Sequence, residues 1–79
     1  MRILDEENDK ALNGLTLYLT MSEASELKDS LEAILADPIG RHEHVTSKDG
    51  SKEITVCIYD MGGLDQFDDR SKKLITDDV

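Results

Sequence analysis

The chain has 79 residues, of which 18 are acidic and 9 are basic, so its formal net charge is -9 at pH 7. This length leaves room for one domain, and the negative charge disfavours direct binding to nucleic acid or to an anionic membrane surface. We therefore predict a single small domain over residues 1–79 that binds neither nucleic acid nor a membrane.

The N-terminus and the cysteine content favour a cytoplasmic protein. Residues 1–7 turn acidic before the apolar core of a signal peptide could form, and no apolar run approaches the roughly 20 residues of a membrane-spanning helix. Cys57 has no second cysteine with which to form an intramolecular disulfide, which fits a reducing compartment. We expect a cytoplasmic location. The small size leaves a homodimer and a monomer equally open.

The first twenty residues contain two strand-like segments. Residues 3–4 suggest a short strand, and Asn8-Asp9 in the charged stretch that follows favours a turn. Residues 15–20 alternate leucine with threonine or tyrosine, and this period of two predicts a strand with one apolar face. Asn13-Gly14 before it either turns the chain back on residues 11–12 or starts the strand.

An amphipathic helix is predicted over residues 21–36. Thr20 and Glu23 have the spacing of a capping box, in which each side chain accepts a hydrogen bond from the other residue's backbone N–H. Asp37-Pro38 ends the helix, because the residue before a proline is pushed out of the helical conformation. The predicted apolar face comprises Ala24, Leu27, Leu31, Ile34 and Leu35, and the opposite side carries Glu23, Glu26, Lys28, Asp29 and Glu32.

A β-hairpin is predicted next, with strands at residues 41–46 and 52–59. Asp-Gly between two strand-like segments is a strong hairpin signal, and here it is Asp49-Gly50. If these two residues are the centre of a tight turn, His42 pairs with Cys57 and His44 pairs with Thr55. We expect the more polar strand 41–46 at an edge of the sheet, where its charges discourage association of sheets.

A turn at residues 60–63 leads into a second predicted helix, at about residues 65–76. Its acidic residues come first and its basic residues follow, which is the order that the helix dipole favours. The glycines of the turn lack a phosphate-binding pattern and are flanked by aspartates, so we expect a flexible connection there.

Together these elements predict an α+β fold of the order β-α-β-β-α, with an extra N-terminal strand as an option. A right-handed crossover makes strands 15–20 and 41–46 parallel, with strand 52–59 antiparallel between them. The resulting three- or four-stranded, antiparallel-rich sheet packs on the first helix. Its other face would be covered by the second helix or by another chain, and it carries Tyr18, Tyr59, Cys57 and the two histidines.

His42, His44 and Cys57 are the candidate metal ligands. Imidazole and thiolate both suit zinc, and the predicted register places all three on one face of the hairpin. A shift of one residue in the register would disperse them, and edge-strand histidines are ordinarily half-exposed polar residues. We expect no high-affinity zinc site here, and a metal- or small-ligand-binding domain is the alternative. No third group orients His42 toward Cys57 for catalysis, so we predict neither an enzyme nor a cofactor.

The acidic surface has two interpretations. One is solubility, and the other is electrostatic steering toward a basic protein, in the way that an inhibitor or immunity protein finds its target. We predict a non-catalytic protein-interaction or regulatory module whose partner is a basic protein or a second copy of the chain. The candidate interaction surface consists of Tyr18, Tyr59, Glu23, Glu26, Asp29 and Glu32.

Several segments of residues 13–60 carry a resemblance. They are Leu17-Tyr18-Leu19-Thr20, Glu23-Ala24, Leu27, Leu31, Leu35-Ala36-Asp37-Pro38, His42-Glu43-His44 and Glu53-Ile54-Thr55-Val56. In these segments the chain resembles small uncharacterised bacterial proteins. The resemblance implies a bacterial cytoplasmic origin and gives no residue a functional role.

Overall fold

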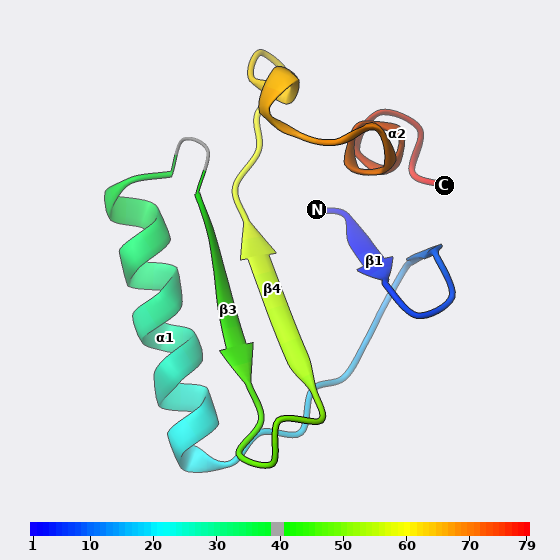
Figure 1. The fold of residues 1–79 in the computed structure, drawn as a ribbon. Coiled ribbons are helices and arrows are strands. Elements are labelled where there is room, and N and C mark those ends of the chain that lie inside the picture. The colour runs from blue at the N-terminus through cyan, green and yellow to red at the C-terminus, as the bar shows by residue number, and fades with distance from the viewer. Residues whose placement is uncertain (39–40) are drawn as a thin grey trace. The chain divides into compact units, whose positions relative to one another are not determined.

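The computed structural model describes residues 1–38 and 41–79 and has an α+β fold (Figure 1). In chain order its elements are β1 (Ile3–Asp5), β2 (Lys10–Leu12), α1 (Met21–Ala36), β3 (His42–Thr46), β4 (Glu53–Cys57), the 3₁₀ helix η1 (Leu64–Gln66) and α2 (Asp69–Asp77). The α+β class is therefore confirmed. Among the described residues, however, the strands form two separate antiparallel pairs, β1-β2 and β3-β4, rather than one sheet of three or four strands.

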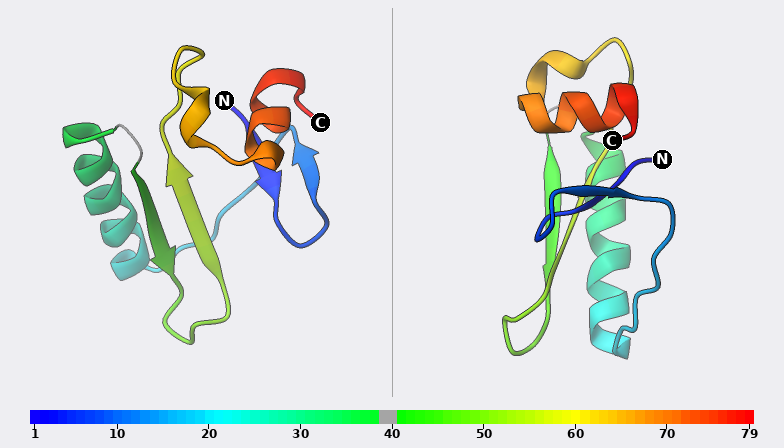
Figure 2. Two further views of the ribbon diagram at one scale, coloured as in Figure 1. Left: turned by 45° about the horizontal axis from the view of Figure 1, so that its top comes forward. Right: turned by 90° about the vertical axis from the view of Figure 1, so that its right-hand side faces the viewer.

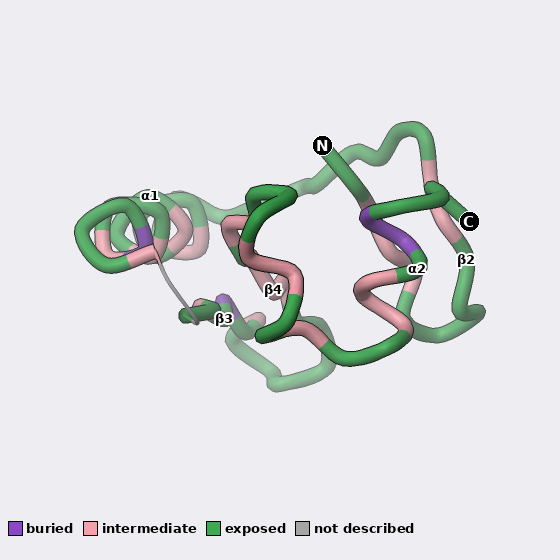
Figure 3. Tube along the Cα trace, turned by 90° about the horizontal axis from the view of Figure 1, so that it is seen from above, coloured by how far each residue is buried: buried purple, intermediate pink, exposed green. Residues whose placement is uncertain are grey.

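The chain divides into two compact units. One comprises residues 1–17 and 61–79, and the other comprises residues 18–60. Each unit has a pair of well-buried side chains: Leu74 and Ile75 in the first, Ile34 and Val45 in the second (Figure 3). The prediction of one domain over residues 1–79 stays a prediction.

The unit of residues 18–60 consists of the β3-β4 hairpin and α1, which packs on β3 (Figures 1 and 2). The predicted bounds of the helix are confirmed, because the capping box forms. Thr20 Oγ1 accepts from the Glu23 backbone N–H at 3.2 Å, and Glu23 Oε1 accepts from the Thr20 N–H at 2.9 Å. Ile34 is only 1% exposed and Val45 only 4%, so these two side chains form the centre of this unit.

Only two of the five residues of the predicted apolar face of α1 face inward. Leu27 and Ile34 lie on the line that faces inward, whereas Leu31 is 44% exposed and Leu35 is 71% exposed. Ala24, which lies two and three helical turns before Leu31 and Leu35 on the same line, is exposed as well. A hairpin of two strands covers a narrower strip of helix than the predicted wider sheet, so the second apolar line is left uncovered.

The predicted strand over residues 15–20 is wrong. These residues have no ladder partner among the described residues, and the side chains of Leu15, Leu17 and Leu19 are exposed. Alternation of leucine and threonine predicts a strand only when another strand supplies hydrogen bonds and a core covers the apolar face. Asn13-Gly14 has neither of its predicted roles, because β2 has already ended at Leu12 and no strand starts after it.

In the other unit, β1 and β2 form a short hairpin in which Asp5 pairs with Lys10. The predicted strand at residues 3–4 and the turn at Asn8-Asp9 are both confirmed, whereas β2 was not predicted. Asp5 Oδ1 accepts from the backbone N–H groups of Glu7 at 3.1 Å and Asn8 at 3.2 Å, and Asp9 takes a left-handed conformation with φ 55°. Local side-chain hydrogen bonds therefore close this loop.

The second predicted helix is interrupted. Phe67 is extended, with ψ 153°, and separates η1 from α2. Asp68 caps α2 by accepting from the Ser71 N–H at 2.7 Å, and a residue in that role must itself be non-helical. A single helix over residues 65–76 is thus excluded by the N-cap in its middle.

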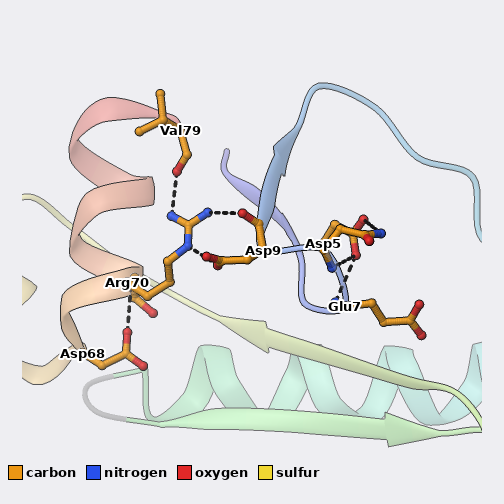
Figure 4. A network of polar contacts seen from close by, with 8 residues as sticks. Asp5, Glu7, Asp9, Asp68, Arg70 and Val79 are labelled. Carbon is orange, nitrogen blue, oxygen red and sulfur yellow. Dashed lines mark hydrogen bonds and ion pairs between the residues drawn. The ribbon is translucent and has the colours of Figure 1, made fainter.

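Arg70 joins the two ends of the chain within this unit (Figure 4). Its guanidinium forms an ion pair with the Asp9 carboxylate and also donates to the backbone oxygens of Asp9 at 3.2 Å and Val79 at 2.6 Å. A second arginine, Arg2, donates to the Ile75 carbonyl at 3.1 Å. Since each element of this unit is short, these hydrogen bonds and the ion pair hold the β1-β2 loop and α2 together.

The first prediction concerns the face of α1 that is buried. Ile34→Ala should lower the free energy of unfolding by about 2 to 4 kcal/mol, because it leaves a cavity at the most buried position. Leu31→Ala should cost less than about 1 kcal/mol, because that side chain is half exposed. Urea melts followed by circular dichroism measure both values. Equal losses would show that the inward line of the helix is wrongly assigned.

The second prediction concerns Arg70. Arg70→Ala should destabilise the protein by about 1 kcal/mol, a value kept low because the Asp9 carboxylate is largely exposed. Lys73→Ala, an exposed cation on the same helix, is the matched control and should change stability by less than about 0.5 kcal/mol. If thermal melts of the two variants coincide, the Arg70 contacts do not hold this unit together.

Candidate functional site

The register of the β3-β4 hairpin decides which side chains share a surface. Its pairs include His42 with Cys57 and His44 with Thr55, so the predicted register is confirmed. The turn itself differs from the predicted two-residue type. The Ser47 N–H donates to the Lys52 carbonyl at 2.9 Å, and the Gly50 N–H donates to the Ser47 carbonyl at 2.9 Å. These hydrogen bonds close a loop of four residues. The longer loop has the same centre, and for that reason the register is the same.

Asp49 holds this loop together. Its Oδ1 accepts from the Ser47 hydroxyl at 2.8 Å, the Ser51 hydroxyl at 2.7 Å and the Ser51 N–H at 2.9 Å. These hydrogen bonds, those from Ser51 first, lower the pKa of the Asp49 carboxyl to about 2. Gly50 supplies the left-handed residue that the loop needs, with φ 76°.

One face of the hairpin points away from α1, and we call it the outer hairpin face. It consists of His42, His44, Thr46, Glu53, Thr55 and Cys57. Because side chains alternate along a strand, the residues between these positions, Val45 among them, face the helix instead. The residues of the outer hairpin face are exposed, except for Thr55, which is half-buried.

The side chains of the outer hairpin face are ordered by polar contacts. Nδ1 of His44 lies 2.8 Å from Thr55 Oγ1 and 3.2 Å from Glu53 Oε1, and the Thr55 hydroxyl lies 3.4 Å from the same carboxylate oxygen. A carboxylate can only accept, so this contact favours the tautomer of His44 with its proton on Nδ1 and a lone pair on Nε2. The rings of His42 and His44 meet edge to face, with centroids 4.9 Å apart.

The candidate metal ligands thus lie on one face, as the register requires. Nevertheless, over residues 1–38 and 41–79 no group of three or more His, Cys, Asp or Glu side chains is placed to hold a metal ion. His42 and His44 lie close to each other, whereas Cys57 is exposed at the end of β4. The alternative of a metal- or small-ligand-binding domain that uses all three residues stays a prediction.

The residues of the candidate interaction surface are spread over different elements. Tyr18 is 92% exposed and precedes α1, while Tyr59 is half-buried and follows β4. Glu26, Asp29 and Glu32 are exposed on α1, where Glu32 also pairs with Lys28 at 3.7 Å. The expected common sheet face for the two tyrosines is not formed, because residues 15–20 are not a strand.

Glu23 has a structural role at the start of α1. Its pKa is lowered chiefly by the backbone N–H and the hydroxyl of Thr20, with a smaller contribution from the backbone N–H of Lys48. The beginning of α1 therefore lies close to the loop of the hairpin. A carboxylate engaged in this way is less available to a partner than the other acids of the helix.

The exposure of several apolar residues of α1 was not predicted. Besides Leu31 and Leu35, Met21 in the first turn is almost fully exposed. The broad apolar face was itself the signal, since it is wider than a strip that one hairpin covers. Recognising it required knowing that residues 15–20 do not join the sheet.

Comparisons with known proteins assign no relationship. No family model matches the chain, and neither a curated protein nor a solved structure matches it. The resemblance to small bacterial proteins stays a prediction. In the part of the chain that the structure describes, no helix has the length and apolar character needed to cross a membrane.

The third prediction concerns Asp49 and acid. Because the pKa of Asp49 in the folded protein lies below its ordinary value of 3.8, its carboxylate stabilises the hairpin above about pH 4. That contribution is lost as the pH falls through about 2. Asp49→Ala should thus lower the urea midpoint at neutral pH, and the difference from wild type should shrink toward pH 2.

Asp29→Ala is the matched control, since Asp29 is exposed on α1. Its urea midpoint should stay close to that of wild type at each pH. If Asp49→Ala melts like this control at neutral pH, the Asp49 hydrogen bonds do not stabilise the loop.

Proposed function

We propose that the protein is a non-catalytic interaction module that binds a basic protein through the exposed apolar line of α1. The observation that carries the proposal is the exposure of Leu31 and Leu35, one turn apart on a helix whose other apolar line, with Leu27 and Ile34, faces inward. Exposed apolar side chains at helical spacing suit a partner that covers them, and contiguous patches of this kind often mark interaction sites.

The charge of the helix supports a basic partner. Glu26, Asp29 and Glu32 are exposed on the same helix, within a chain that carries twice as many acidic as basic residues. Complementary charge accelerates encounter and disfavours acidic competitors, whereas the apolar line supplies burial once the partner has docked. We also propose that the protein is bacterial and cytoplasmic and that it catalyses no reaction.

A second copy of the chain is the alternative occupant of the same line. Small domains gain stability from association, but two copies of this acidic helix would bring like charges together. Apolar burial would have to outweigh that repulsion. We therefore favour a basic partner over a homodimer.

The fourth prediction tests the apolar line of α1. Immobilised wild-type protein and its Leu35→Glu variant are compared for quantitative capture of proteins from source cells, and the captured protein is then purified and titrated. We expect a basic protein whose affinity falls at least about tenfold in Leu35→Glu, because the variant places a charge in a desolvated contact. Its association should also slow as salt is added.

Ser25→Glu is the matched control, because it adds the same charge at an exposed position of α1 away from Leu31 and Leu35. This control should bind the partner at least as tightly as wild type, because its added charge lies on the acidic side of the helix. Equal capture by Leu35→Glu and Ser25→Glu would contradict the proposal. A wild-type dimer that becomes monomeric in Leu35→Glu by sedimentation would assign the line to a second copy instead.

A further inference from the structure

We infer that His42 and His44 form a two-imidazole site for a late first-row divalent metal ion such as Zn²⁺, with Nε2 of His44 as one ligand. This site lies on the outer hairpin face and is independent of the proposed function of α1. Both residues belong to β3 and are two positions apart, so they share one face of the strand whatever its pairing. Both are exposed, which leaves an ion free access.

The spacing of the two rings fits a common ion. With metal–nitrogen distances of about 2.0–2.1 Å and an angle near that of a tetrahedral or octahedral site, two imidazoles on one ion have ring centres about 4.6 to 5.3 Å apart. The rings of His42 and His44 have centroids 4.9 Å apart. Binding would then require reorientation of the His42 ring but no movement of the strand.

Glu53 and Thr55 prepare His44 for this role. A metal-binding histidine usually donates its other ring N–H to a carboxylate or a similar acceptor, which fixes the tautomer and orients the ring. Nδ1 of His44 has such partners, Thr55 Oγ1 at 2.8 Å and Glu53 Oε1 at 3.2 Å. Nε2 of His44 then carries the lone pair that can bind an ion, and we regard Glu53 and Thr55 as positioning residues.

The donor set limits both the ion and the number of protein ligands. Imidazole suits zinc, nickel and copper, whereas magnesium and calcium prefer oxygen donors. No third His, Cys, Asp or Glu of residues 1–38 and 41–79 completes a group that could hold an ion. The site therefore has two protein ligands, and Cys57 is not one of them. Water would fill the other positions, and moderate affinity is expected.

The fifth prediction uses the fact that the chain contains only two histidines, whose ring signals can be observed directly by nuclear magnetic resonance. Zn²⁺ is titrated into the full chain at neutral pH, with excess Mg²⁺ present to occupy carboxylates. We expect both rings to shift together toward a one-to-one end point. His42→Gln and His44→Gln should each lower the affinity by at least about tenfold.

Two further variants separate the roles of the neighbouring residues. Cys57→Ser should leave the zinc affinity unchanged, because its thiol is not a ligand. Glu53→Gln should weaken zinc binding by up to about tenfold and should also raise the Nε2-protonated fraction of His44 in the zinc-free protein, as read from ring nitrogen shifts. A purely structural role of Glu53 would leave that tautomer ratio unchanged.

Three outcomes would overturn the inference: neither ring shifts with Zn²⁺, either glutamine variant keeps wild-type affinity, or Cys57→Ser abolishes binding. The wild-type titration requires no substitution, so it decides the matter even if a variant fails to fold. Circular dichroism melts of each variant confirm that the fold is retained before its affinity is compared.

Discussion

The Asp49 loop is the constraint on which the hairpin unit depends. By binding Ser47 and Ser51, its carboxylate fixes a four-residue loop whose centre sets the pairing of β3 with β4. Side chains alternate across a strand, so a slip of one residue would turn His42 and His44 toward the helix and Val45 toward solvent. The helix could then not bury its inward line, and the outer hairpin face would not exist.

Small size explains why so much apolar surface remains outside. Each unit has one pair of well-buried side chains, while several leucines before and within α1 stay exposed. Two strands and one helix cannot enclose an apolar face that would match a wider sheet. The same shortage of covering elements that keeps the core thin leaves an apolar line of α1 exposed.

The negative charge serves local structure as well as the surface. Asp5, Glu23, Asp49 and Asp68 all have a lowered pKa, because each accepts hydrogen bonds from nearby N–H or hydroxyl groups at a turn or a helix start. These carboxylates hold the backbone and contribute to stability above their ordinary pKa values, and the contribution is lost as the pH falls through the lowered values. Acids on the open side of α1, such as Asp29, are exposed.

The sequence by itself determined the elements whose partners lie a few residues away. Thr20 and Glu23 set the start of α1, Pro38 follows its end, and the segment around Asp49 set the hairpin register and with it the pairing of His42 with Cys57 and of His44 with Thr55. Only the tertiary structure decided whether residues 15–20 would pair, which line of α1 would be buried, and where Arg70 would bind. Caps and turns are satisfied within a few residues, whereas ladder pairing and burial depend on distant segments, which periodicity alone does not specify.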